Sequence, residues 1–321
     1  MWVRDLANIQ KIKRGFLNPR KASRYFLPRP FLKQNGPILI NEENEKKLEK
    51  NLVWIFGMHR SGTTWLGKQL LSYHTHFWNE PGIGRFLGTT IDSGPKIRRI
   101  EMGQRRKNFF FQYDFKDTWL LYLKKLILAR INAEFQDTSK KIIVQEPNGS
   151  MGSDILSESL PQSKIIIVQR DPRDIIDSMV DSMKEGGWRS NWLGYSLTSE
   201  NRLSFIEDQA NKIVNTWEIL WKTYKNHSKN LRYLVKYEDL RKNTLQELEK
   251  LYRFIEIDID KKILEKIYEK TRFENLRSSK KGSGKSRRSA TPGKWKENLS
   301  NEDKNVIEKI LIETLKKLGY E

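Results

Sequence analysis

The chain has 321 residues, no cysteine, and 60 Lys and Arg against 40 Asp and Glu, which gives a formal charge of +20 at pH 7. This length suits one α/β domain with appendages, or at most two domains. The absence of cysteine excludes disulfides, thiolate metal sites and Cys nucleophiles. The charge attracts polyanions in general. No helix-turn-helix, RNP or zinc-finger pattern is present, so we expect no specific nucleic-acid recognition.

Positive charge gathers in two regions of the chain. Residues 1–50 are predicted to form a basic N-terminal arm or extension of a domain that covers residues 51–321. We find no apolar run of signal-peptide length and no segment near the roughly 18 apolar residues of a membrane span, so we expect a cytoplasmic protein. The basic clusters are interpreted either as solvated segments or as surfaces that attract a membrane or an anionic acceptor. Their cations are Arg4, Lys11, Lys13, Arg14, Arg20, Lys21, Arg24, Arg29 and Lys33, and Arg277, Lys280, Lys281, Lys285, Arg287 and Arg288.

The first predicted element after the arm is a buried strand at Leu52–Phe56, which a glycine turn and a helix at Thr64–Ser72 follow. Gly57 and Gly62 have the G-x-x-x-x-G spacing of a P-loop, whose backbone N–H groups converge on phosphate oxygens beside a helix N-terminus. In an ATP- or GTP-binding P-loop a Lys follows the second Gly, whereas this chain has Thr63. The loop therefore favours a nucleotide whose 5′ end is shorter than, or chemically different from, a triphosphate.

Short apolar runs then alternate with helical patterns. Residues 79–137 are aromatic and charged with weak periodicity, and we expect them to line an acceptor pocket. The alternation predicts a three-layer α/β fold with a central parallel sheet and with ligands at the carboxyl ends of the strands. The last helix is expected to have Ser300 as its N-cap and Asp303 at its third position. The predicted strands are Lys141–Gln145, Lys164–Gln169 and Leu231–Val235, and the predicted helices are Ser150–Leu160, Pro172–Met183, Thr244–Ile255, Lys261–Lys270 and Asn301–Leu318.

Two blocks of this chain resemble motifs of the sulfotransferases that use 3′-phosphoadenosine 5′-phosphosulfate (PAPS). The glycine turn resembles the loop that holds the 5′-phosphosulfate end, and the run from Lys164 to Ser178 resembles the 3′-phosphate motif. In that motif a strand ends in Arg170, whose guanidinium can bind a phosphate with two hydrogen bonds. The resemblance implies a P-loop NTPase-like sulfotransferase fold, PAPS as cofactor, PAP as product and no metal. It places at the nucleotide Arg60, Ser61, Gly62, Thr63, Thr64, Trp65 (stacked on adenine), Arg170 and Ser178.

A third block, Arg288–Lys296, resembles the C-terminal segment that folds over the 3′-phosphate in this family. Arg288, Gly293 and Trp295 match the pattern, whereas Ser289 and Ala290 replace its Lys and Gly. The Gly- and Ser-rich run before it, residues 278–289, is expected to be mobile when no nucleotide is bound. Its closure would bury the cofactor.

Sulfuryl transfer needs a general base and groups that stabilise charge on the leaving phosphate. The resemblance implies that Arg60 and the loop amides serve the leaving group. Glu80, followed by Pro81, resembles the catalytic Glu-Pro of carbohydrate-type sulfotransferases and is the first candidate for the base. Its rivals are Glu146, His74 and His76, and a histidine has the better resting pKa for the task. Gln145 stands where the family usually has a Lys, so one expected positive charge is missing.

The predicted function is transfer of a sulfuryl group from PAPS to an acceptor hydroxyl, on a carbohydrate or another small metabolite. Two alternatives stay open. One is a P-loop kinase, although Thr63 in place of the kinase Lys argues against it. The other is a catalytically inactive PAPS- or PAP-binding protein of the same fold, which Gln145 keeps open. The sequence names neither the acceptor nor the oligomeric state.

Overall fold

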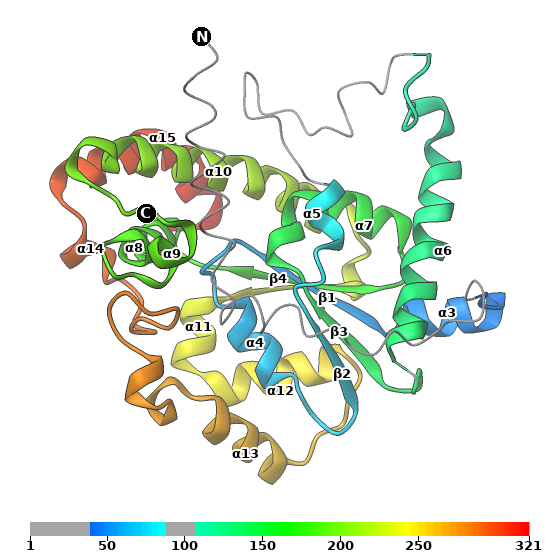
Figure 1. Cartoon of the computed structure of the whole chain (residues 1–321). Coiled ribbons are helices and arrows are strands. Elements are labelled where there is room, and N and C mark those ends of the chain that lie inside the picture. The colour runs from blue at the N-terminus through cyan, green and yellow to red at the C-terminus, as the bar shows by residue number, and fades with distance from the viewer. Residues whose placement is uncertain (1–38, 88–106, 136, 321) are drawn as a thin grey trace.

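The computed structural model describes residues 39–87, 107–135 and 137–320, apart from the side chains of Arg85 and Phe86. The basic N-terminal cluster and the middle of the expected acceptor-pocket region lie outside the described residues. A five-stranded parallel sheet with strand order β2-β3-β1-β4-β5 lies at the centre (Figure 1), which confirms the predicted fold class. Its strands are β1 (Leu52–Gly57), β2 (Thr75–Asn79), β3 (Lys141–Gln145), β4 (Lys164–Gln169) and β5 (Arg232–Lys236).

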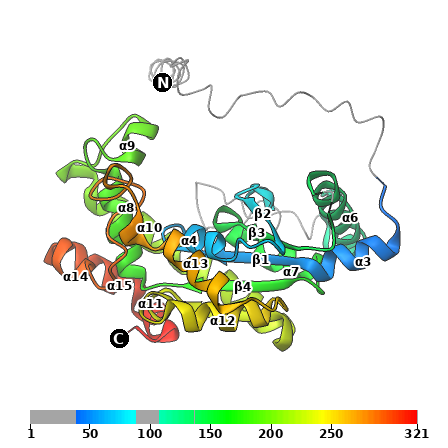
Figure 2. The same cartoon turned by 90° about the horizontal axis from the view of Figure 1, so that it is seen from below.

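Helices cover both faces of the sheet, which makes three layers. Side chains of β1 alternate between the faces, with Leu52, Trp54 and Phe56 on one side and Val53 and Ile55 on the other. Figure 2 shows α6 and α12 on opposite sides of β1. The first face carries α3 (Glu42–Asn51), α6 (Lys116–Glu134), α7 (Ser153–Ser159), α8 (Pro172–Met183), α10 (Ser199–Asn226), α14 (Trp295–Asn298) and α15 (Asn301–Leu318). The second carries α4 (Thr63–Gln69), α11 (Tyr237–Lys242), α12 (Thr244–Phe254) and α13 (Lys261–Thr271).

The helix after the first strand is shorter than predicted. α4 ends at Gln69 instead of Ser72, because the Thr75 side chain takes over the hydrogen bonds at this point. Its hydroxyl donates to the Leu70 carbonyl at 2.9 Å and accepts from the Ser72 N–H at 2.9 Å. This turn directs the chain into β2, a strand that the sequence pattern does not predict.

The predicted helix at residues 150–160 is wrong in its first part, where the structure has a 3-10 helix, η2 (Pro147–Gly152), that leads into α7. η2 packs closely on the short helix α5 (Ile83–Leu87) through three glycines. A Cβ built on Gly149 would lie 2.7 Å from the Cα of Gly84, and one on Gly152 would lie 2.6 Å from the Gly84 carbonyl oxygen. Glycine is therefore required for this backbone contact, which fixes the segment after β3.

Several further helices, among them α10 and α3, are not predicted by the pattern. α10 is 28 residues long and begins with a capping box between Thr198 and Asn201. α3 lies almost entirely within the expected N-terminal arm, yet its Leu48 is fully buried in the hydrophobic core on the first face of the sheet. α15, in contrast, begins as predicted, with reciprocal hydrogen bonds of 3.0 Å between Ser300 and Asp303. Among the helices described, none is long and apolar enough to cross a membrane.

Candidate active site

The loop after β1 is shaped by two glycines that cannot be replaced without strain. Gly57 has φ 155°, and a Cβ there would lie 2.8 Å from the Val168 carbonyl oxygen. The Ser150 hydroxyl accepts from the Gly57 N–H at 3.0 Å and donates to the Gly57 carbonyl at 2.9 Å. Gly62 has φ 96°, and a Cβ there would lie 2.6 Å from the Tyr237 ring. The loop therefore has the predicted tight geometry, and α4 begins directly after it.

Arg60 links the loop to the end of β4 and to α8. Its backbone is left-handed, with φ 72°, and its carbonyl accepts from Arg170 Nη1 at 2.7 Å. Its guanidinium donates to the Ser178 hydroxyl at 2.9 Å and to the Ser286 carbonyl at 2.7 Å. Burial, followed by the charges of Arg170 and Arg288, lowers the pKa of Arg60 to about 10. The structure thus brings three predicted phosphate-binding residues together, and we call Arg60, Arg170 and the neighbouring Arg288 the cationic cluster.

Trp65 lies on the opposite side of the loop, at the start of α4. Its ring meets Tyr237 edge to face at 5.9 Å between centroids, and the Arg241 guanidinium lies 5.2 Å from its ring. Its indole N–H donates to the Thr271 carbonyl at 3.1 Å. Arg170 lies over the other part of this aromatic pair, 4.5 Å from the Tyr237 ring. The half-buried Trp65 ring is therefore held close to Arg170, since both contact Tyr237.

Gln145, at the end of β3, faces the two threonines that follow the loop. It is fully buried, and its Nε2 donates to the hydroxyls of Thr63 at 3.0 Å and Thr64 at 3.3 Å. Its Oε1 is buried and has no partner among the described residues. Ser61 is buried as well, and its hydroxyl donates to the Met58 carbonyl at 2.7 Å. A neutral amide thus occupies the place where the family resemblance implies a Lys.

Two carboxylates lie beside this amide, one buried and one exposed. Glu146 is fully buried, and its Oε2 accepts from the N–H groups of Gly82 at 2.9 Å and Ile83 at 3.0 Å. Burial raises the pKa of Glu146 to about 7, against the effect of these hydrogen bonds, and the charge of Glu80 adds to the increase. Glu80 is exposed, has φ 52°, and accepts from Asn148 Nδ2 at 3.0 Å. The two candidates therefore have different environments.

The structure does not bring the candidate histidines to the loop. His76 is the second residue of β2, and its Nε2 lies 2.8 Å from the Asp137 carbonyl oxygen. Its ring stacks on Phe135 at 4.8 Å between centroids. Asn79, at the other end of β2, pairs with the end of β3 and lies near the loop. His74 precedes β2 and is exposed, so neither histidine lies at the edge where the carboxyl ends of the strands meet.

Three aspartates on one face of α8 bind the C-terminal segment, and the sequence analysis misses them. Asp174, Asp177 and Asp181 have the spacing i, i+3 and i+7, which puts them on one face of the helix. This spacing is the feature of the sequence from which a shared role could have been predicted. Burial raises the pKa of Asp174, although the hydrogen bonds that it accepts from two backbone N–H groups lower that pKa. Asp174 accepts from the backbone N–H groups of Gly293 at 2.7 Å and Trp295 at 3.2 Å. Asp177 accepts from Arg288 Nη1 at 2.8 Å and from Asn298 Nδ2 at 3.0 Å. Asp181 accepts from the Ser283 hydroxyl and from the backbone N–H of Gly284, both at 2.8 Å.

These contacts fix the positions of Arg288 and Gly293, the two residues of the C-terminal segment that are predicted to bind the nucleotide. The Arg288 guanidinium binds Asp177 and is close enough to Arg60 to lower the pKa of Arg60, which places Arg288 in the cationic cluster. The N–H of Gly293 is already bonded to Asp174, so Gly293 holds the segment in place in this state. Mobility of residues 278–289 without nucleotide stays a prediction. In the described part of the chain, no group of three or more His, Asp or Glu side chains is arranged to hold a metal ion.

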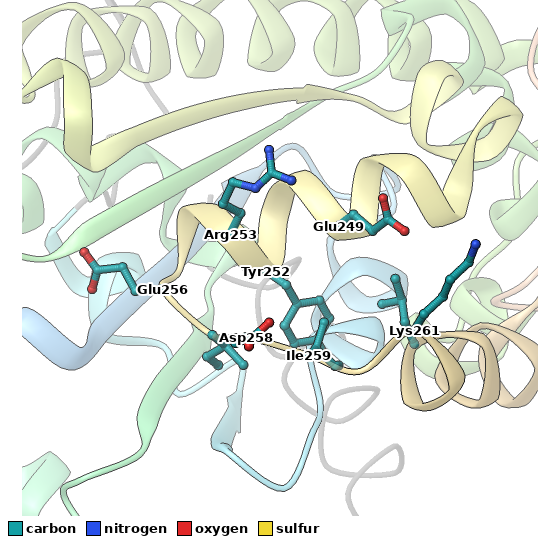
Figure 3. Close-up of a pocket in the computed structure, with 9 residues that line it drawn as sticks. Glu249, Tyr252, Arg253, Glu256, Asp258, Ile259 and Lys261 are labelled. Carbon is teal, nitrogen blue, oxygen red and sulfur yellow. The ribbon is translucent and has the colours of Figure 1, made fainter.

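A separate groove of about 520 Å³ lies between α12 and α13 (Figure 3). Glu256 on its wall binds Lys141 and Lys164 at 2.9 Å, and these lysines are the first residues of β3 and β4. The groove is therefore at the amino ends of the strands, away from the loop. It contains none of the predicted site residues. Its lining consists of Glu249, Tyr252, Arg253, Glu256, Ile257, Asp258, Ile259, Lys261 and Leu264.

Comparison with known proteins agrees with this architecture. Residues 50–319 match the family described as the sulfotransferase domain. Carbohydrate sulfotransferase 1 of Danio rerio is 28% identical over 167 residues, which cover 49% of this chain and 38% of the relative. The Homo sapiens protein of the same name is 27% identical over 165 residues, with 49% and 38% coverage. The match thus spans well under half the length of these relatives.

A solved structure shares the fold. The crystal structure of mouse sulfotransferase SULT7A1 complexed with PAP superposes with a TM-score of 0.52 and 16% identity, over 86% of this chain and 90% of that chain. At this identity the likeness concerns the fold alone. The family match, in contrast, extends over most of the sequence and includes both predicted nucleotide motifs. The chain belongs to the sulfotransferase family.

Proposed function

We propose that the protein transfers a sulfuryl group from PAPS to an acceptor hydroxyl on a carbohydrate and releases PAP. The observation that carries the proposal is the meeting of Arg60, Arg170 and Ser178 at a P-loop that has Thr63 in place of a nucleotide-kinase Lys. In the reaction the bond between sulfur and the phosphate oxygen breaks, a bond from sulfur to the acceptor oxygen forms, and the acceptor proton passes to a base.

The residues present fit this nucleotide. In the cationic cluster the charges of Arg170 and Arg288 lie close enough to Arg60 to lower the pKa of Arg60, and a bound phosphate would reduce this repulsion. The Nε of Arg170 is buried without a partner among the described residues and is a free donor. The left-handed Gly62 turns the loop directly into the N-terminus of α4, where backbone N–H groups and the helix dipole favour a phosphate. Arg60, Arg170, Ser178 and Arg288 would hold the phosphates.

Glu80 is the first candidate for the general base. Its carboxylate is exposed at the edge where β2 and β3 end, so an acceptor hydroxyl can reach it. Glu146 has a pKa near 7, which suits a base, but its carboxyl is buried and already accepts two N–H groups. We therefore assign proton abstraction to Glu80 and the positioning of residues 82–83 to Glu146.

The carbohydrate acceptor is supported by the relatives, which are carbohydrate sulfotransferases by name. Family membership argues against the kinase alternative. The inactive binding protein remains the second candidate because Gln145 supplies no cation beside Thr63 and Thr64. A cytoplasmic location and attraction to anionic surfaces stay predictions.

Isothermal titration calorimetry with PAP, ADP and ATP tests the nucleotide site. We expect binding that depends on the 3′-phosphate and that weakens roughly 10- to 100-fold in Arg60→Ala and Arg170→Ala, because each loses charge-assisted hydrogen bonds worth about 1.5–3 kcal/mol. Arg253→Ala, an exposed arginine in the groove at the other edge of the sheet, is the matched control. Binding of ATP in preference to PAP, or equal affinities for all variants, would refute the site. Labelled PAPS and a panel of carbohydrates then separate the enzyme from the inactive binding protein.

A further inference from the structure

An exposed aromatic surface follows α8 and begins beside Arg60 of the cationic cluster. α9 (Trp188–Leu193) carries Trp188 and Trp192, which are 38% and 75% exposed, and Tyr195 follows it at 54% exposed. The positions 188 and 192 are four residues apart and lie on the same side of the helix. Single exposed apolar residues are common, but a contiguous group of large rings marks an interaction site. We call Trp188, Trp192 and Tyr195 the aromatic platform.

The aromatic platform is joined to the reaction site by direct contacts. The Arg60 guanidinium lies 5.8 Å from the centroid of the Trp188 ring. The backbone N–H of Trp188 donates to the Gly284 carbonyl at 2.8 Å, and the backbone N–H of Gly284 donates to Asp181 on α8. Trp192 lies one turn further along α9, so the rings lead away from Arg60. A molecule that reacts beside the loop can therefore extend along them.

At its far end the aromatic platform continues into a groove of about 300 Å³. Tyr195 and Leu197, which precede α10, form one part of the lining, and the first turns of α10 form the rest. The lining combines apolar rings and chains with amide, hydroxyl and carboxylate groups, which is typical of sites for polar organic ligands. The residues are Tyr195, Leu197, Asn201, Ser204, Phe205 and Asp208.

We propose that the acceptor is an oligosaccharide chain, and that the aromatic platform binds its sugar units next to the one that reacts. This proposal rests on the proposed function. A pyranose ring has C–H groups on its faces and hydroxyls at its rim, so aromatic rings can cover the faces while the rim stays hydrogen-bonded. Trp188 contacts the sugars nearest to the reacting hydroxyl, and Trp192 and Tyr195 contact units further along the chain. A small metabolite would leave Trp192 and Tyr195 without a role.

Glycan-array binding by the whole protein tests this assignment, with arrayed chains of one to ten sugars as the probe. We expect the wild type to bind at least one class of chain of four or more sugars and not the corresponding monosaccharide. Trp192→Ala is expected to weaken that binding roughly three- to tenfold, since it removes one ring contact. Tyr73→Ala, which removes a ring that is 85% exposed near the start of β2, is the matched control and should bind like the wild type.

Three results would refute the proposal that the aromatic platform binds sugar units. These are equal glycan binding by Trp192→Ala and the wild type, no preference for chains over monosaccharides, and no glycan binding by a wild type that binds PAP. A fourth result would come from an assay with vesicles of phosphatidylcholine and phosphatidylserine. If the wild type binds these vesicles and Trp192→Ala does not, the surface is assigned to a membrane. Glycan binding without PAP binding would instead refute the proposed function and leave the aromatic platform standing.

Discussion

Replacing Glu146 by Gln removes a carboxylate that folding buries beside the reaction site. The amide has the same shape, and its oxygen can accept the N–H groups of Gly82 and Ile83 that the carboxylate accepts now. The change therefore removes the charge and leaves the hydrogen bonds in place. The wild-type carboxylate, in contrast, has one oxygen that is buried without a partner among the described residues.

The effect on stability follows from the pKa of Glu146, which burial raises from 4.5 to about 7. Between these values the folded state keeps the proton and the unfolded chain does not, so the free energy of unfolding falls as pH rises. Below pH 4.5 both states are protonated and the penalty is absent. Above pH 7 the full penalty of a buried charge applies, on the order of 3 kcal/mol. Glu146→Gln carries no charge at any pH, so it is expected to be more stable than the wild type by up to about 3 kcal/mol at pH 8.

Urea unfolding followed by tryptophan fluorescence at pH 4.5, 6 and 8 measures this difference. We expect it to be small at pH 4.5 and to grow with pH. Glu185→Gln is the control, because it removes an exposed carboxylate whose charge does not act on Glu146. A difference between Glu146→Gln and the wild type that does not change with pH, or a variant that is less stable at pH 8, would refute the argument.

Four further outcomes are expected at the site. Glu80→Gln should lower kcat roughly a hundredfold or more with unchanged PAP affinity, since it removes the proposed base; unchanged turnover would reassign that role. Gln145→Lys should not reduce activity, because it restores the cation of the family pattern, and a large loss of activity with intact PAP binding would contradict this. Trp65→Ala should weaken PAP binding in calorimetry, whereas unchanged affinity would mean that the ring only packs against α13. Gly84→Ala should lower the free energy of unfolding by about 1–3 kcal/mol, because its Cβ would lie 2.4 Å from the Gly149 carbonyl oxygen; wild-type stability would show that α5 can move aside.

Strands buried on both faces were readable from the sequence, because β1, β3 and β4 are continuous apolar runs. β2 lies at the edge of the sheet and is mostly half-exposed, so its mixture of polar and aromatic residues has no clear period. The split between η2 and α7 depends on the contact of Gly149 and Gly152 with Gly84. Such a contact joins segments more than sixty residues apart, and local pattern cannot report it.

The same distinction applies to the site. Arg60, Arg170 and Ser178 belong to motifs whose spacing is fixed by a strand, a turn and a helix, so their meeting was predictable. The environment of Glu146 was not, since its burial, which raises its pKa, and its hydrogen bonds with residues 82–83, which lower it, both depend on how distant segments pack around it. The role of Asp174 as an anchor for the C-terminal segment likewise required the tertiary structure.

The Ser150 hydroxyl accepts from the N–H of Gly57 and donates to its carbonyl, which has a consequence for ligand binding at the loop. The scaffold itself satisfies the first glycine of the loop, so the loop has its curvature in the absence of a ligand. Binding of the nucleotide therefore orders little backbone there and loses little conformational entropy. In the proposed reaction, exchange of PAP for PAPS would then leave the shape of the loop unchanged.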